Sequence, residues 1–133
     1  MISIGIADDD ALVRQTLTDL LSRNDDIVVA WTAKDGQEAL DLFHSSEVES
    51  RVQAVLVDVQ MPKMDGLALA QALLEEKPDI AILILTTFTA DSIVDKAMAL
   101  GVRGFVAKED GASSLAGAIH QAVDRKSTRL NSS

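Results

Sequence analysis

Carboxylates, a hydroxyl and an amine follow four short apolar runs of this chain. They are Asp8, Asp9 and Asp10 after the first run, Asp58 after a central run, then Thr86 and Lys108. If these runs end at one place in the fold, several carboxylates meet there and repel one another. A hard divalent cation relieves that repulsion, and Mg²⁺ prefers a few carboxylates together with water and phosphate oxygens. The chain has no cysteine and no histidine cluster, which disfavours zinc.

A cation, a lysine and a hydroxyl around one carboxylate suit phosphoryl transfer, because they neutralise charge on the phosphoryl oxygens. The carboxylate itself can act as nucleophile and form an aspartyl phosphate. Asp58 is the best candidate because it stands alone after the central run, whereas Asp8 and Asp9 are paired and better placed to hold metal. The alternative is that each residue has an ordinary structural role: the aspartates cap helices, Thr86 is a strand residue without function, and Lys108 is solvated. Such roles would have to apply after all four apolar runs at once, so we favour a shared site.

The apolar runs alternate with helical patterns along the whole chain. Apolar runs at 2–7, 27–32, 52–57, 80–85 and 102–107 predict strands, and helical spacing predicts helices over 11–23, 36–43, 66–77, 90–100 and 112–124. This alternation predicts an α/β fold with a parallel sheet covered by helices on both faces. Five strands suit the order 2-1-3-4-5, which brings the carboxyl ends of the first and third strands together.

Length and charge limit the classes of function. The chain has 133 residues, and we assign one domain to 1–124. Residues 125–133 are basic and polar, so we expect a flexible tail, the start of a linker or a cloning remnant. No stretch approaches the ~18 apolar residues of a membrane span, and no basic leader precedes the first strand, so we expect a cytoplasmic protein without a membrane partner. The formal net charge of −9 would repel phosphates, so we expect no direct binding of nucleic acid by this chain.

Four motifs occur in order at the predicted strand ends. They are ADDD at 7–10, DVQMPKMDG at 58–66, LTTF at 85–88 and GFVAKED at 104–110. With these motifs the chain resembles the receiver domains of two-component response regulators over 2–124, and most closely the NarL/FixJ (LuxR-type) subfamily. The resemblance implies a three-layer (βα)5 flavodoxin-like receiver fold. It also implies a signalling switch rather than an enzyme, which in the intact protein controls a C-terminal DNA-binding domain and transcription.

The resemblance also implies roles for individual residues and partners. Asp58 would be the phosphoacceptor, phosphorylated by a sensor histidine kinase. Asp9, Asp58 and the backbone carbonyl of Gln60 would hold Mg²⁺, with Asp8 acting mainly through water. Lys108 would bind the phosphoryl group.

The switch would consist of Thr86 and Phe105, with Thr87 as the small residue beside the phosphate. Phe105 has no hydroxyl, so a switch that depends on a hydrogen bond from that aromatic residue is lost. The helix over 11–23 would be the kinase-docking face. The face made by 91–100, the fifth strand and the last helix would change its affinity for a partner or a second copy, giving a phosphorylation-dependent homodimer.

Two alternatives come from other classes of protein. A small phosphatase that works through an aspartyl phosphate would use the Asp8-x-Asp10 spacing, as haloacid-dehalogenase-like enzymes do. Against it, Leu12 stands where Thr or Val is usual, and no acidic pair follows Lys108 at a further strand. A flavodoxin-like binder of flavin mononucleotide ranks lower, because the first turn lacks a phosphate cradle rich in Ser, Thr and Gly.

Overall fold

Strands and helices alternate five times in the computed structural model, which describes residues 1–45, 51–86, 91–108 and 112–131. The strands are β1 Ile2–Ala7, β2 Ile27–Ala33, β3 Ala54–Asp58, β4 Ala81–Thr86 and β5 Gly104–Ala107. The helices are α1 Ala11–Leu21, α2 Gly36–His44, α3 Gly66–Glu76, α4 Asp91–Leu100 and α5 Ala112–Asn131. All ten elements predicted from the sequence are therefore present, with ends that differ by a few residues except at the end of α5.

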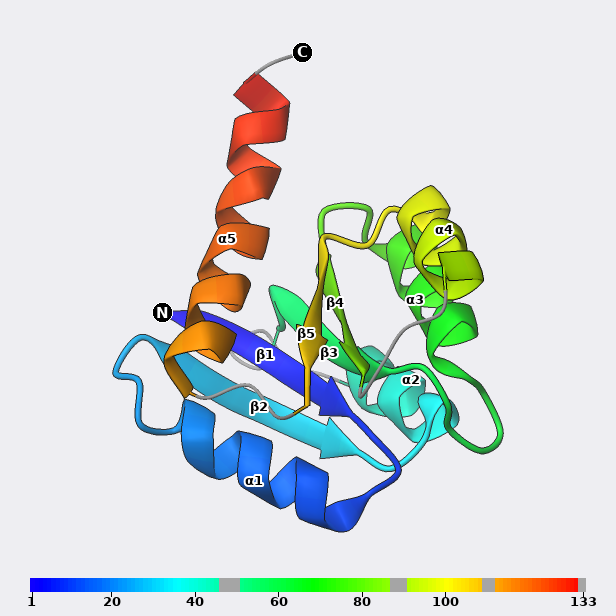
Figure 1. Ribbon diagram of the computed structural model, residues 1–133, viewed down its shortest axis with the longest axis horizontal. Coiled ribbons are helices and arrows are strands. Elements are labelled where there is room, and N and C mark those ends of the chain that lie inside the picture. Colours follow the sequence, from blue (N-terminus) through cyan, green and yellow to red (C-terminus); the bar gives the residue numbers. More distant parts are fainter. Residues whose placement is uncertain (46–50, 87–90, 109–111, 132–133) are drawn as a thin grey trace.

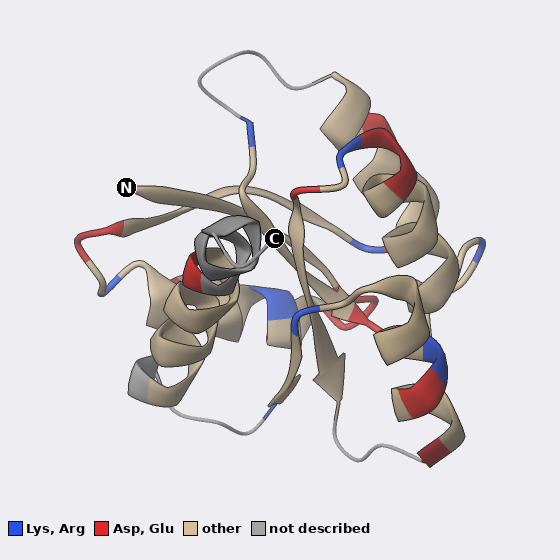
Figure 2. Cartoon of the chain, turned by 90° about the horizontal axis from the view of Figure 1, so that it is seen from above, with Lys and Arg blue, Asp and Glu red and all other residues tan. Residues whose placement is uncertain are grey.

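The five strands form one parallel sheet in the order β2-β1-β3-β4-β5, as predicted (Figure 1). The central strand β3 is buried along its whole length, which explains why its sequence is continuously apolar before Asp58. Asp58 is the only charged residue within the five strands, and Figure 2 shows that the other charged positions coloured there lie on helices and loops. The sheet thus carries a single charge, at the end of its central strand.

Helices cover both faces of the sheet and enclose two apolar clusters. One cluster packs α1 and α5 against the sheet, with Leu17, Leu21, Leu115 and Ile119 among its buried residues. The other packs α2, α3 and α4 against the opposite face, with Leu69 and Leu73 of α3 fully buried. The three-layer architecture follows from these two clusters. Within the described residues, no helix combines the length and the hydropathy needed to cross a lipid bilayer.

The last helix is longer than the sequence pattern predicts. We expected it to end near Asp124, but its backbone stays helical to Asn131 and extends beyond the body of the domain (Figure 1). No glycine or proline interrupts 125–131, and Arg, Lys and Leu are good helix formers, so the segment can continue the helix without an apolar face. The division into a domain at 1–124 and a tail at 125–133 stays a prediction.

Candidate functional site

Asp8 is the innermost carboxylate of the candidate site. It follows β1 and is fully buried. Its backbone N–H donates to the carbonyl of Ala33 (3.0 Å), and its Oδ1 accepts from the N–H of Asp10 (2.9 Å). The guanidinium of Arg14 in turn donates to the carbonyl of Asp8 (2.7 Å). These contacts fix Asp8 in position through the backbone of β2, the backbone of Asp10 and the side chain of Arg14 on α1.

The three aspartates after β1 differ in what they contact. Asp10 is the N-cap of α1, and its Oδ1 accepts from the N–H of Leu12 (2.9 Å). Asp8, exposed Asp9 and Asp58 each offer a carboxylate oxygen, and these oxygens lie within 4.8 Å of one another. The structure therefore brings Asp8, Asp9 and Asp58 together, whereas Asp10 has a capping role and is not part of the group.

Lys108 neutralises part of this charge. Its Nζ lies 2.9 Å from Oδ2 of Asp8 and 3.3 Å from Oδ1 of Asp58, and only 18% of the side chain is exposed. The residue directly follows β5, and its backbone N–H donates to the carbonyl of Thr86 (3.0 Å). Three carboxylates and one ammonium leave the group with excess negative charge.

The surroundings of Asp58 change its acidity. Burial and the neighbouring charge of Asp8 raise the pKa of Asp58 from 3.8 to about 6, although Lys108 acts in the opposite direction. For Lys108, burial opposes the charged form. The hydrogen bonds to Asp8 and Asp58 and the negative charges of these two residues outweigh the effect of burial. They raise the pKa of Lys108 above its ordinary value. A cluster of oxygen ligands with excess negative charge fits a hard cation such as Mg²⁺.

The loop from 59 to 65, between β3 and α3, lies against Asp58. The N–H of Gly66 donates to the carbonyl of Val59 (2.8 Å), and Asp65 caps α3 by accepting from the N–H of Ala68 (2.9 Å). A Cβ at Gly66 would lie only 2.1 Å from the carbonyl oxygen of Asp58, so a larger residue does not fit there. Gly66 therefore allows the chain to turn back closely beneath the acidic group.

The residues predicted to switch lie on two neighbouring strands. Thr86 is the last residue of β4 and pairs with Ala107 of β5, next to Lys108. Phe105, also on β5, is partly buried and packs against the apolar cluster on the side of α2, α3 and α4. Thr87, predicted to lie beside the phosphate, is outside the described residues.

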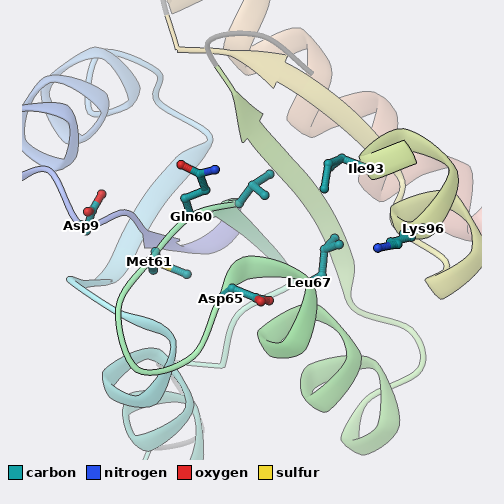
Figure 3. A pocket seen from close by; sticks show the side chains of 8 residues that line it. Asp9, Gln60, Met61, Asp65, Leu67, Ile93 and Lys96 are labelled. Atoms are coloured by element: carbon teal, nitrogen blue, oxygen red, sulfur yellow. The ribbon is translucent and has the colours of Figure 1, made fainter. Parts of the chain in front are cut away.

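A groove of about 560 Å³ lies between Asp9 and α4 (Figure 3). Its lining residues are Asp9, Val59, Gln60, Met61, Asp65, Leu67, Ile93 and Lys96. Figure 3 shows Gln60 and Met61 on the β3–α3 loop, near Asp9, with Ile93 and Lys96 across the groove on α4. Asp58 does not line the groove, but Val59 and Gln60, which directly follow it, do.

Known proteins share this fold and sequence pattern. The sequence profile of the response regulator receiver domain matches residues 4–120. The chain is 32% identical to the transcriptional regulatory protein LnrK of Bacillus subtilis, over 90% of this chain and 52% of that protein. It is also 32% identical to a protein-glutamate methylesterase/protein-glutamine glutaminase of Methanococcoides burtonii, over 99% of this chain and 37% of that protein. A LuxR-family DNA-binding response regulator from Staphylococcus aureus superimposes with a TM-score of 0.82 at 26% identity, covering 92% of this chain and 99% of that one.

The chain belongs to the response regulator receiver domain family. It spans between about a third and three fifths of the length of these and similar curated relatives, some named as regulators of transcription and others as methylesterases. The family match and the sheet order together bear out the predicted receiver fold.

Proposed function

We propose that this chain is a phosphorylation-controlled signalling switch that receives a phosphoryl group on Asp58 from a sensor histidine kinase. The observation that carries the proposal is the meeting of Asp58 with Asp8, Asp9 and Lys108 at one end of the sheet. Phosphoryl transfer needs a carboxylate nucleophile in surroundings that can accept the charge of the phosphoryl oxygens. The single charged residue of the sheet is such a nucleophile.

In the proposed step, one carboxylate oxygen of Asp58 forms a bond to phosphorus while the bond from phosphorus to the kinase histidine breaks. The histidine nitrogen keeps the electron pair. Bound Mg²⁺, held by Asp9, Asp58 and the carbonyl of Gln60, would supply charge neutralisation for the phosphoryl oxygens. With a pKa of about 6, Asp58 is mostly ionised at neutral pH and so available as nucleophile. Lys108, 3.3 Å from Asp58, is close enough to donate to the new phosphoryl group.

The phosphoryl group would then change contacts outside the site. Thr86, at the end of β4, would move toward it, and Phe105 on the neighbouring strand would repack. The groove between the β3–α3 loop and α4 supports this path, because Ile93 and Lys96 of α4 line it together with Gln60. We propose that the face formed by α4, β5 and α5 thereby gains affinity for a second copy.

We propose further that the chain is the input domain of a NarL/FixJ-type (LuxR-type) regulator. Regulators of transcription among its relatives support this, and this chain matches 52% and 60% of the length of two of them. In that case the kinase would dock on α1 to phosphorylate Asp58, and a C-terminal domain would bind DNA. The methylesterase relatives make an enzymatic output domain the competing proposal.

The phosphatase alternative would need Asp10 as a reacting group, and Asp10 caps α1 instead.

Intact mass tests the proposal. The chain and its Asp58→Asn variant are incubated with Mg²⁺ and a small acyl phosphate, whose carboxylate leaves as the phosphoryl group is transferred. We expect a gain of one phosphoryl group that is absent in the variant. A gain that survives in the variant would move the nucleophile to the Asp8–Asp10 cluster and favour the phosphatase. No gain in a folded, Mg²⁺-binding chain would overturn the proposal in favour of a fold used only for binding.

A further inference from the structure

The N-terminus of α2 lies directly against the β3–α3 loop. A Cβ at Gly36, the first residue of α2, would lie 2.4 Å from the carbonyl oxygen of Met64 and 2.7 Å from its Cβ. Gly36 does not have a positive φ, so backbone conformation does not explain the glycine. What Gly36 allows is the close approach of two segments that are far apart in sequence.

α2 is firmly held at this end. Asp35, only 2% exposed, is its N-cap and accepts from the N–H of Glu38 (2.8 Å). The carboxylate of Glu38 in turn accepts from the N–H of Lys34 (2.8 Å), and Ala39 is fully buried against the sheet. The N-terminus of α2 is therefore held in place where it contacts the loop.

The loop that meets this surface has a strained backbone. Lys63 has a φ of 69°, and the N–H of Met64 donates to the carbonyl of Pro62 (2.7 Å), which together form a γ-turn. A γ-turn with positive φ at a residue other than glycine is rare and costs free energy. Nζ of Lys63 lies 4.0 Å from Oδ2 of Asp35, so the buried N-cap attracts the strained residue.

The other end of the same loop is fixed to Asp58. Gly66 leaves no room between the loop and the carbonyl of Asp58, and its N–H is bonded to Val59. Met64 lies between this anchored end and Gly36, so we expect a displacement of Met64 to shift the loop backbone as far as Asp58 and Gln60, both of which the proposed function assigns to Mg²⁺.

We propose that Asp35 and Gly36 are positioning residues for the metal and phosphoryl site, acting through the strained loop at 59–65. The inference rests on the proposed function. The N-terminus of α2 holds the loop in the geometry in which Asp58 and the carbonyl of Gln60 are ready to bind Mg²⁺. Replacing a residue that positions a metal ligand typically lowers metal affinity by about 10-fold to 100-fold.

The first test compares two Gly→Ala variants by titration calorimetry with Mg²⁺. Gly36→Ala must displace Met64 by more than half an ångström, and we expect its Mg²⁺ affinity to fall about tenfold or more. Gly117→Ala in α5, where no atom lies within 4 Å of the added Cβ, should keep the affinity of the unsubstituted chain. Urea unfolding of both variants shows that each is folded during the titration.

The second test removes the negative charge of Asp35 without adding volume. Asn caps helices about as well as Asp, so Asp35→Asn should keep α2 but lose its attraction for Lys63. We expect a few-fold loss of Mg²⁺ affinity. Asp41→Asn, the same change at an exposed position of α2, should cause none.

Each outcome bears on the inference. Unchanged Mg²⁺ affinity in folded Gly36→Ala and Asp35→Asn would overturn it, even if both variants lose stability, because the two residues would then be purely structural. Absence of Mg²⁺ binding by the unsubstituted chain would overturn the cofactor of the proposed function as well. The two failures are thus distinguishable in one series of titrations.

Discussion

At the residue scale, Asp58 carries a charge where the protein excludes most water. Its side chain is 10% exposed, and burial beside Asp8 raises its pKa to about 6. A carboxylate that binds its proton more tightly in the folded state favours folding at low pH, and this contribution is lost as the pH rises through the folded pKa. Ionised Asp58 therefore costs stability between its ordinary pKa of 3.8 and about pH 6, and the full cost persists above that.

Replacing Asp58 by Asn should remove this cost. Without divalent cations, we expect Asp58→Asn to be more stable than the unsubstituted chain by roughly 3 kcal/mol at about pH 7.5, since the pKa of Asp58 rises from 3.8 to about 6 and each pKa unit is worth about 1.4 kcal/mol. At about pH 4.5 the difference should shrink well below that value, because Asp58 is then mostly protonated in the folded state. Urea unfolding at both pH values measures the difference.

A control for this measurement is Asp25→Asn, which removes one negative charge from an exposed loop position. A stability gain in Asp58→Asn that is the same at both pH values would exclude ionisation of Asp58 as its cause, since only that ionisation makes the gain depend on pH. Addition of Mg²⁺ should narrow the difference at the higher pH, because bound cation stabilises the unsubstituted chain in particular.

At the element scale, the turn between β1 and α1 gives neighbouring carboxylates different roles. Asp9→Ala should weaken Mg²⁺ binding by about tenfold or more while leaving stability unchanged or higher, because it removes a ligand from a group with excess negative charge. Asp10→Ala should lower stability by about 1 kcal/mol through loss of the N-cap of α1. Titration with Mg²⁺ and urea unfolding of both variants separate the roles.

The two variants also test the phosphatase alternative. If Asp10 were a reacting group, Asp10→Ala would abolish chemistry with a small acyl phosphate. As an N-cap alone, Asp10 can be replaced with phosphorylation of Asp58 retained. Loss of the phosphoryl gain in a folded Asp10→Ala variant would therefore contradict the proposed roles.

The strands and their order could be predicted because the sequence signals for them, apolar runs and helical spacing, are local and periodic. A parallel strand buried on both faces is continuously apolar, and the alternation with helices determines the crossovers, so the meeting of Asp8, Asp58 and Lys108 follows from the order 2-1-3-4-5. The irregularity between β1 and β2 was not predictable. There the register shifts after Ile4, and Trp31 packs against Gly5, a contact between segments distant in sequence.

The same limit applies to the site. Residues at strand ends could be predicted from their types, but the relation of Asp35 and Gly36 to the β3–α3 loop could not. Their sequence signal, Asp-Gly before a helix, predicts only a turn and an N-cap. The approach of Gly36 to Met64 exists only once α2 and the loop are packed together.

At the scale of the whole molecule, two exposed apolar residues lie on opposite layers. Leu12 at the start of α1 is 73% exposed, and Met98 on α4 is 52% exposed. Helix α1 covers one face of the sheet and α4 the other (Figure 1). The proposed function assigns α1 to the kinase and α4 to the second copy, so input and output should be separable by substitution.

Sedimentation of the phosphorylated chain tests this separation. With Mg²⁺ and a small acyl phosphate, we expect the unsubstituted chain and Leu12→Glu to dimerise. Met98→Glu should take up the phosphoryl group equally but dimerise more weakly, by about tenfold or more, because a charge would be buried in the interface. The reverse pattern, with Leu12→Glu impaired and Met98→Glu intact, would move the second copy to α1. A fully phosphorylated chain that stays monomeric would contradict the homodimer and assign the α4 face to a different partner.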